Sequence, residues 1–292
     1  MKNRLLFPII FAFIFVFIFS ACSDFSGNED EVEASLKPVP VAKQKKEEKE
    51  EEDTVTTRTY YDLNGITFGD NTFVAVGERG IVRYSSSDNR SSWDNGTSGT
   101  TRQLNEIAYG DSTFVAVGDD GTNLYSSDNG ATWSSGTTTE TSDYDGVANG
   151  DNVFAAGGNT NIIRSTDNGS TWSTITTVNL RDVAFGNSTF VACGADGATY
   201  TSDNGSQWSS YAGIKVTSNL LRGIAFGNNI FVAVGASGTL IKSTNNGGTF
   251  SVGVSQVSTT LNSIAYGNNM FLAVGTNTVI ASPDNTGSAL GI

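Results

Sequence analysis

The sequence predicts an all-β protein, a six-bladed β-propeller built from four-stranded repeats of about 40 residues. The first observation is a motif that reads roughly L-x-x-I-A-F/Y-G-D/N-x-x-F-V-A-V-G and begins at Leu63, Leu104, Tyr144, Leu180, Leu221 and Leu261. Two glycines keep a separation of eight residues in every copy. Gly, Ser, Thr and Asn abound in the repeats and helix formers are scarce, which suits short strands and many turns. We therefore assign residues 59–292 to one propeller domain.

The first 21 residues have the features of a secretory signal peptide. Lys2 and Arg4 precede an apolar run of 15 residues from Leu5 to Phe19, and small residues follow it. This run is short for a membrane-spanning helix, which needs about 20 residues. An uncleaved signal anchor remains an alternative.

Phe19-Ser20-Ala21-Cys22 resembles the lipobox of bacterial lipoproteins, although a phenylalanine stands where that family prefers leucine. The resemblance implies that Cys22 becomes the lipidated first residue of the mature protein and anchors it in a bacterial envelope. Several acyl chains, palmitate among them, would hold it firmly, because a single chain binds a membrane only marginally. Ser23 is not the aspartate of an inner-membrane retention signal, which favours the outer membrane or the cell surface. An ordinary cleavage site is the alternative.

Residues 22–58 are predicted to form a charged, disordered tether. Pro38 and Pro40 oppose a helix start, and Lys43 to Asp53 contains no apolar residue. Such a segment cannot bury enough apolar surface to offset the entropy lost on ordering. Its expected role is to space the propeller from the membrane.

The second repeat shows how one copy becomes a blade. Strands are predicted over residues 104–109, 113–117 and 123–127, with turns at residues 110–112 and 118–121. The second strand is apolar at each of residues 114–117, which indicates that both of its faces are buried between neighbouring blades. A tight turn, residues 128–130, then leads to Trp133.

The last element of each copy, S-x-D-x-G-x-x-W, resembles the Asp-box, also called the BNR repeat. Its aspartate is expected to accept backbone N–H bonds across its own turn, its glycine to supply a positive φ, and its tryptophan to bury an apolar face. We interpret it as structural, because one carboxylate per turn is too few for a dedicated calcium site, and no metal site is predicted. Its residues in the first four copies are Asp88, Trp93, Asp128, Gly130, Trp133, Asp167, Gly169, Trp172, Asp203, Gly205 and Trp208.

The sixth copy is cut short after Asp284, and the segment Thr54–Tyr61 before the first copy has the composition of a strand. The hypothesis is that this segment pairs with the last blade and closes the ring, which removes an exposed edge.

Turns alternate between the two ends of a propeller, and only one end is predicted to vary between repeats. The turns between second and third strands and the connections between blades share that end, where charge is concentrated. Divergent, charged loops are where a propeller usually carries a binding site, although these side chains could equally be ordinary solvated charges. The candidate ligand-binding residues are Arg79, Arg102, Asp119, Asp120, Asp145, Arg181, Tyr211 and Arg222.

Composition excludes several classes of site. The chain has no histidine, which removes Ser-His-Asp and Cys-His nucleophile systems. The formal charge of −13 disfavours a nucleic-acid partner, because phosphate binding needs clustered Lys and Arg. Cys193 replaces the valine of other copies and is predicted to be a small buried residue. No cofactor is predicted.

Residues 63–287 resemble several Asp-box propeller families. Sialidases carry an Arg-Ile-Pro motif, which is absent because no proline lies between Pro40 and Pro283. The tandem phrase is more similar to the repeat of photosystem II assembly factors, which are non-enzymatic and hold a protein partner. The resemblance implies a lipid-anchored binding or scaffold module for a protein or glycan. The alternative is a carbohydrate-active, sialidase-like hydrolase that uses acids such as Asp119 and Asp145 in an unrecognised arrangement.

Overall fold

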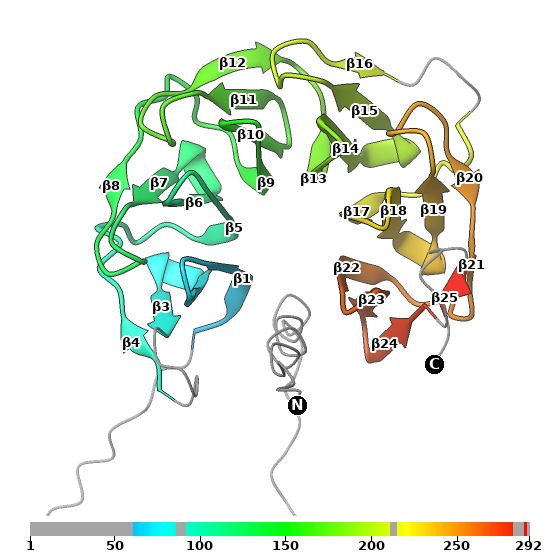
Figure 1. The fold of residues 1–292 in the computed structure, drawn as a ribbon, viewed down its shortest axis with the longest axis horizontal. Coiled ribbons are helices and arrows are strands. Elements are labelled where there is room, and N and C mark those ends of the chain that lie inside the picture. Colours follow the sequence, from blue (N-terminus) through cyan, green and yellow to red (C-terminus); the bar gives the residue numbers. More distant parts are fainter. Residues whose placement is uncertain (1–60, 86–91, 211–214, 283–288, 291–292) are drawn as a thin grey trace, which may run out of the picture. The chain divides into compact units, whose positions relative to one another are not determined.

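The computed structural model describes residues 61–85, 92–210, 215–282 and 289–290. It confirms an all-β, six-bladed β-propeller, with antiparallel sheets arranged around a common centre (Figure 1). The described residues contain only 3₁₀ turns besides strands, and none of their helices is long and apolar enough to cross a membrane. Cys22, the tether and the segment 54–60 lie outside the described residues.

Each of the first five blades is a four-stranded meander. Blade 1 contains β1 (Leu63–Gly69), β2 (Thr72–Gly77), η1 (Glu78–Gly80), β3 (Val82–Ser85) and β4 (Asp94–Asn95). Blade 2 contains β5 (Leu104–Gly110), β6 (Thr113–Gly118), η2 (Asp119–Gly121), β7 (Asn123–Ser126) and β8 (Ser134–Ser135). Blade 3 contains β9 (Tyr144–Gly150), β10 (Val153–Gly158), β11 (Ile162–Ser165) and β12 (Ser173–Thr176).

Blade 4 contains β13 (Leu180–Gly186), β14 (Thr189–Gly194), η3 (Ala195–Gly197), β15 (Thr199–Ser202) and β16 (Ser209–Ser210). Blade 5 contains β17 (Leu221–Gly227), β18 (Ile230–Gly235), η4 (Ala236–Gly238), β19 (Leu240–Ser243) and β20 (Ser251–Val252). Blade 6 has three strands among the described residues: β22 (Leu261–Gly267), β23 (Met270–Gly275) and β24 (Thr278–Ala281). A parallel pair joins β21 (Val254–Ser255) to β25 (Ala289–Leu290).

The D/N-x pairs of the motif form the first hairpin of each blade. In blade 1, Asp70 and Asn71 have φ values of 44° and 62°. Positive φ at both central residues is typical of a two-residue turn whose twist matches the flanking strands. Asp and Asn tolerate this conformation better than most residues, which explains their recurrence here.

The second strands of the first five blades lie in the middle of their sheets and are buried throughout. All six residues of β2, β6, β10, β14 and β18 are buried, as the continuous apolar pattern predicts. Cys193 in β14 is fully buried among apolar residues of blades 4 and 5. The core therefore consists of successive layers between neighbouring blades, such as Val232 and Leu240 of blade 5 against Leu261 of blade 6.

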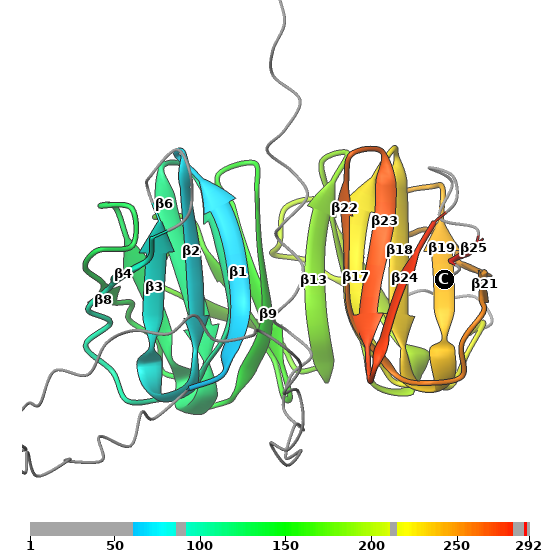
Figure 2. The same cartoon turned by 90° about the horizontal axis from the view of Figure 1, so that it is seen from below.

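The strands run between two ends of the propeller (Figure 2). We call one end the turn rim: it carries the first hairpin turns, such as Asp70–Asn71, and the turns between third and fourth strands. The other end, which we call the divergent rim, carries η1 to η4 and the connections between blades. Backbone bonds join these two features, since Glu78 N donates to Asp62 O at 2.9 Å and Asp119 N donates to Gln103 O at 3.0 Å.

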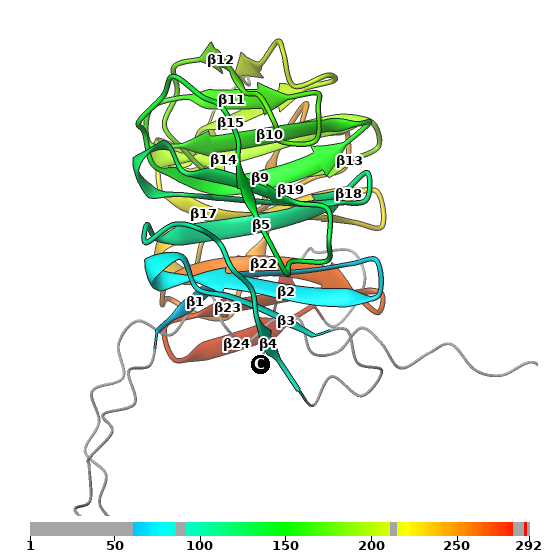
Figure 3. The ribbon, with the colours of Figure 1, turned by 90° about the vertical axis from the view of Figure 1, so that its left-hand side faces the viewer.

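The innermost strands follow one another around the centre, as Figure 3 shows for β1, β5 and β9. Neighbouring pairs from β1 to β22 pack together in turn. Among the described residues, β1 and β22 themselves do not pack in this way, and Figure 1 shows a wider separation between them. We call this place between blades 1 and 6 the seam.

Candidate binding rim

A β-bulge near the start of each first strand positions a polar side chain at the divergent rim. In β5 the pairing with β6 shifts between Leu104 and Glu106, so that Asn105 is the extra residue. A bulge bends its strand and re-aims the side chain it carries. The residues at this position in blades 1 to 6 are Asn64, Asn105, Asp145, Arg181, Arg222 and Asn262.

Several of these bulge residues bond to the next blade. Asn64 Nδ2 donates to the carbonyl oxygen of Leu104 at 2.9 Å. Asn105 Nδ2 donates to the Tyr144 carbonyl at 3.1 Å and to Asp119 Oδ1 at 2.9 Å. The bulge residues therefore link neighbouring blades, and Asn105 also fixes the orientation of one predicted rim carboxylate.

Asp145 and Arg181 form an ion pair across blades 3 and 4. The distance from Arg181 Nη1 to Asp145 Oδ2 is 2.7 Å, and the two side chains are 33% and 25% exposed. Burial raises the pKa of Asp145, the arginine opposes this rise, and the neighbouring charges of Asp143 and Asp119 add to it. Asp119 and Asp143 are thus close enough to Asp145 for their charges to affect its pKa.

Asp120 lies at the tip of η2 with a φ of 52°. Its backbone N–H donates to Asp143 Oδ1 at 2.9 Å. Its carboxylate is paired with Arg102, and the two side chains are 53% and 60% exposed. An ion pair so exposed contributes little to stability, so this cluster leaves carboxylate groups accessible to a partner.

The remaining predicted rim residues are spread around the propeller. Arg79 in η1 lies 5.6 Å from the ring centroid of Tyr61, a cation–π contact. Arg222 is exposed on β17. Tyr211 lies outside the described residues. The structure thus brings Arg102, Asp119, Asp120, Asp145 and Arg181 together in neighbouring blades and places Arg79 and Arg222 apart from them.

Sequence reasoning missed two partly buried carboxylates on the first strands. Glu106 is partly buried between blades 1 and 2, where Gly65 leaves space: a Cβ at Gly65 would lie 2.8 Å from Glu106 Oε1. Its carboxylate accepts a bond from Ile107 N at 2.9 Å. Burial raises the pKa of Glu106 to about 8, and the charge of Asp182 adds to the rise.

Asp182 holds the same position in blade 4, opposite Gly146 of blade 3. Its oxygens accept bonds from Val183 N at 2.7 Å and from Ile224 N of blade 5 at 2.8 Å. Burial raises its pKa to about 7, although these two donors lower it. The signal in the sequence is a glycine in one copy followed by an acid at the same position of the next.

The Ser-x-Asp turns of the turn rim differ, because their carboxylates are bonded within each turn. Asp128 Oδ1 accepts bonds from Thr132 N at 2.9 Å and from Ser126 Oγ at 2.8 Å. The Thr132 hydroxyl donates to Asp128 Oδ2 at 2.6 Å. Burial acts to raise the pKa of Asp128, but these donors hold it below the ordinary value.

The same geometry recurs around Asp167, and Asn245 replaces the aspartate in blade 5. Trp172 is buried and donates through Nε1 to Gly169 O at 2.9 Å. Trp93 is 42% exposed. Asp88 lies outside the described residues.

Blade 4 requires a correction of the predicted motif. The Gly205 N–H donates to Ser202 Oγ at 2.9 Å, so Ser202 and not Thr201 takes the serine position. The turn is one residue shorter, and Asn204 Oδ1 replaces the predicted Asp203 by accepting from Ser206 N at 2.9 Å. Trp208 keeps its bond to Gly205 O at 2.9 Å.

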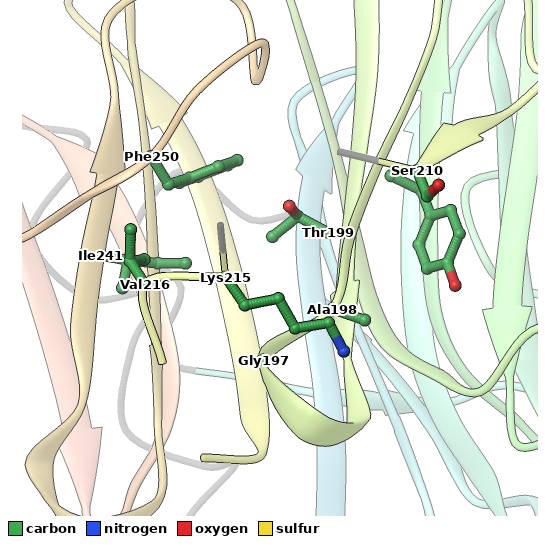
Figure 4. Close-up of a pocket in the computed structure, with 9 residues that line it drawn as sticks. Gly197, Ala198, Thr199, Ser210, Lys215, Val216, Ile241 and Phe250 are labelled. Atoms are coloured by element: carbon green, nitrogen blue, oxygen red, sulfur yellow. The ribbon is translucent and has the colours of Figure 1, made fainter. Parts of the chain in front are cut away.

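A small pocket of about 60 Å³ lies between the outer strands of blades 4 and 5. Phe250, Ile241 and Val216 line one side, and Lys215 extends across toward Ala198 (Figure 4). Lys215 Nζ donates to the Asp196 carbonyl at 3.2 Å. Because a volume of this size holds only about two water molecules, the pocket is too small for a peptide or a sugar.

No protein-family model matches the sequence, and no curated protein matches it. The fold is similar to the WD40 β-propeller domain of Doa1, with a TM-score of 0.62, 15% identity, and coverage of 79% of this chain and 81% of that one. It is similar to YCF48 from Cyanidioschyzon merolae, with a TM-score of 0.59, 18% identity and coverage of 79% and 84%. It is also similar to YCF48 bound to D1 peptide, with a TM-score of 0.59, 16% identity and coverage of 78% of each chain. At such identities the likeness concerns the fold, a β-propeller.

Proposed function

We propose that this chain is a non-enzymatic binding or scaffold module that engages a protein partner through the divergent rim. The observation that carries this proposal is the contrast between the rims. On the turn rim the Ser-x-Asp carboxylates are bonded within their own turns. On the divergent rim Asp120 and Arg102 are more than half exposed, and Asp145 and Arg181 remain partly exposed.

A protein is favoured over a glycan because the described part of the divergent rim presents paired acids and bases. Asp120 of blade 2 lies beside Arg102 on the connection into that blade, and Asp145 of blade 3 lies beside Arg181 of blade 4. Such an arrangement suits a partner of mixed charge. A solved structure of similar fold is of YCF48 bound to a D1 peptide, so at least one such propeller holds a peptide.

The geometry gives no support to the hydrolase alternative. Asp145 is paired with Arg181, and Asp119 accepts a bond from Asn105. Neither carboxylate is placed as an unpaired acid or nucleophile beside a reacting bond, which glycoside hydrolysis requires. A scaffold is therefore the better proposal.

The test is cross-linking of the full-length protein in its native envelope, followed by identification of captured partners. Asp120→Asn and Arg222→Gln alter exposed charges of the divergent rim and should each reduce capture several-fold. Asp151→Asn is the matched control, because Asp151 is an exposed acid on the turn rim. Equal capture by all variants would contradict the assignment of the binding rim.

The second part of the proposal is that Cys22 carries a lipid anchor in a bacterial envelope, at the outer membrane or the cell surface. Its support is the Ser-Ala-Cys sequence after a short apolar run. Metabolic labelling with an alkyne analogue of palmitate should mark the wild-type chain and not Cys22→Ala. Labelling of both proteins to the same extent would disprove this anchor without affecting the proposed rim.

A further inference from the structure

The interface between blades 2 and 3 carries a polar group at a position that is apolar elsewhere in the repeat. The first strand begins with leucine in five blades, and in blade 3 it begins with Tyr144. Tyr144 is fully buried and lies in one apolar cluster with Val115 and Val117 of blade 2. Leu104 packs on blade 1 in the same way. Tyr144 therefore brings a hydroxyl group into a layer that consists of hydrocarbon at the matching place in other blades.

An amide of blade 3 is a second departure from the repeat at this interface. Gly158 N donates to Asn161 O at 3.2 Å, just before the third strand begins. The same backbone bond recurs in four other blades, where the acceptor residues are Ile81, Thr122, Ala198 and Thr239. Only blade 3 among these five has an amide side chain at this position.

A carboxylate on the connection between blades 2 and 3 is the third departure. The connection passes close to Gly121, since a Cβ there would lie 2.1 Å from Glu140 O. The matching glycines of three other blades face Thr100, Thr217 and Val257. Glu140 thus places a negative charge where these connections have uncharged side chains.

Hydrogen bonds fix this carboxylate and the segment that carries it. Asn161 Nδ2 donates to Glu140 Oε2 at 2.8 Å, and Thr174 Oγ1 donates to Glu140 Oε1 at 2.6 Å. The backbone of Glu140 is also held, because its N–H donates to Thr138 Oγ1 at 3.2 Å. The acid of the connection and the amide of blade 3 are therefore joined directly.

Two oxygen atoms beside the carboxylate have no hydrogen-bond partner within the described part of the chain, Tyr144 Oη and Asn161 Oδ1. Their residues are 0% and 4% exposed. Burial raises the pKa of the Tyr144 hydroxyl, the charge of Glu140 adds to the rise, and the nearby polar groups of Asn161 and Thr138 oppose it. The hydroxyl thus stays neutral and lies close to the acid and the amide. Leaving buried oxygens of this kind unpaired costs free energy.

The chemistry of these atoms selects the kind of ligand. The bond from Asn161 Nδ2 to Glu140 orients the amide, so the unpaired atom of Asn161 is an oxygen that can only accept. The site offers a carboxylate, an amide oxygen and a phenolic oxygen, a set that suits a hard cation. One carboxylate is too few for a dedicated calcium site, and its single charge balances a monovalent ion.

We propose that Glu140, Tyr144 and Asn161 form a binding site for a monovalent alkali-metal cation between blades 2 and 3. The ion contacts the two unpaired oxygens and the carboxylate, and it links the connection to the first strand of blade 3 and to the turn before its third strand. Asp143 lies on the same connection, so the ion also steadies the segment that bonds to Asp120 at the divergent rim. This inference is independent of the proposed partner.

Thermal unfolding of the full-length protein in sodium, potassium and choline chloride of equal ionic strength tests the site. Choline is the reference cation, because it is too large to fit among these side chains. The melting temperature should be several degrees higher in sodium or potassium chloride than in choline chloride, since an ion that binds only the folded state stabilises it. Equal melting temperatures in the three salts would show that water alone fills the site and would overturn the proposal.

Two variants assign the salt effect to this site. Glu140→Gln removes the charge, and Tyr144→Leu removes the hydroxyl while restoring the residue of the other five blades, so both should fold and lose the difference between salts. Tyr125→Phe is the matched control and should keep the difference, because Tyr125 packs against the same apolar layer outside the site. A difference that persists in Glu140→Gln and Tyr144→Leu would be a bulk effect of salt and would contradict the proposal. Stabilisation by calcium chloride alone would contradict a monovalent ion.

Discussion

Asp128 and Glu106 belong to the same blade, yet their carboxyl groups are affected in opposite directions. Asp128 lies on the turn rim, where Thr132 and Ser126 donate to it and lower its pKa. Glu106 lies between blades, where burial raises its pKa to about 8. The repeated turn supplies its own donors, whereas an acid that departs from the repeat depends on what the neighbouring blade provides.

The largest expected effect belongs to the turn rim. Trp172→Ala removes a side chain that is 7% exposed and packs between blades 2 and 3. Such a truncation lowers the free energy of unfolding by about 3–5 kcal/mol, measurable by urea denaturation. Trp93→Ala is the control, and since Trp93 is 42% exposed its loss should be clearly smaller. Equal losses of unfolding free energy in the two variants would mean that the burial of the tryptophan does not determine its contribution to stability.

The pH dependence of stability tests the contribution of Glu106, the carboxyl group that lies between blades. Glu106 binds its proton more tightly in the folded protein than in the unfolded chain, so its contribution is present below about pH 4. That contribution is lost as the pH rises through about 8. Glu106→Gln cannot ionise, and it should retain more of its stability between pH 5 and pH 8.5, by a few kcal/mol.

Urea midpoints of wild type and Glu106→Gln at both pH values provide the measurement. Asp120→Asn is the control for the loss of a carboxylate from the same blade, since its side chain is 53% exposed. A wild-type slope identical to that of Glu106→Gln would show that Glu106 does not contribute to it.

Asp128 should show a smaller effect of opposite sign. Its lowered pKa means that its contribution is present above about pH 4 and is lost as the pH falls. Asp128→Ala should cost about 1 kcal/mol at pH 7 and less at pH 3. Asp128→Asn should retain most stability at pH 7, because Asn245 already holds this place in blade 5. Thermal unfolding at the two pH values would detect a failure of either expectation.

The smallest change in stability is expected on the divergent rim. Asp120→Asn removes one partner of an exposed ion pair, so the free energy of unfolding should change by less than about 0.5 kcal/mol. Its Asn side chain suits the positive φ of this position. A larger loss of stability would show that this rim contributes to the scaffold as the turn rim does.

The sequence was sufficient for the blades because each copy contains the local signals for its own strands. The D/N-x pairs specify the first hairpins, and apolar runs such as residues 114–117 specify the buried second strands. The first strands begin at the residues on which the copies align.

What escaped prediction depends on contacts between copies. The burial of Glu106 follows from the missing side chain of Gly65 in the preceding blade, which no single repeat reveals. In blade 4 the spacing of the motif selects Thr201, and only the hydrogen bond to Gly205 shows that Ser202 starts the turn.

The tips of η1 to η4 repeat one backbone conformation while their side chains differ. Arg79, Asp120, Asp196 and Ser237 have φ values of 52°, 52°, 54° and 55°. A cation, two anions and a hydroxyl group therefore occupy the same backbone site in four blades. Because the main chain is the same whichever residue is present, mutation can change the side chains of this surface one position at a time and leave the scaffold intact. The tips form a ready-made set of positions for evolving, or engineering, a new specificity.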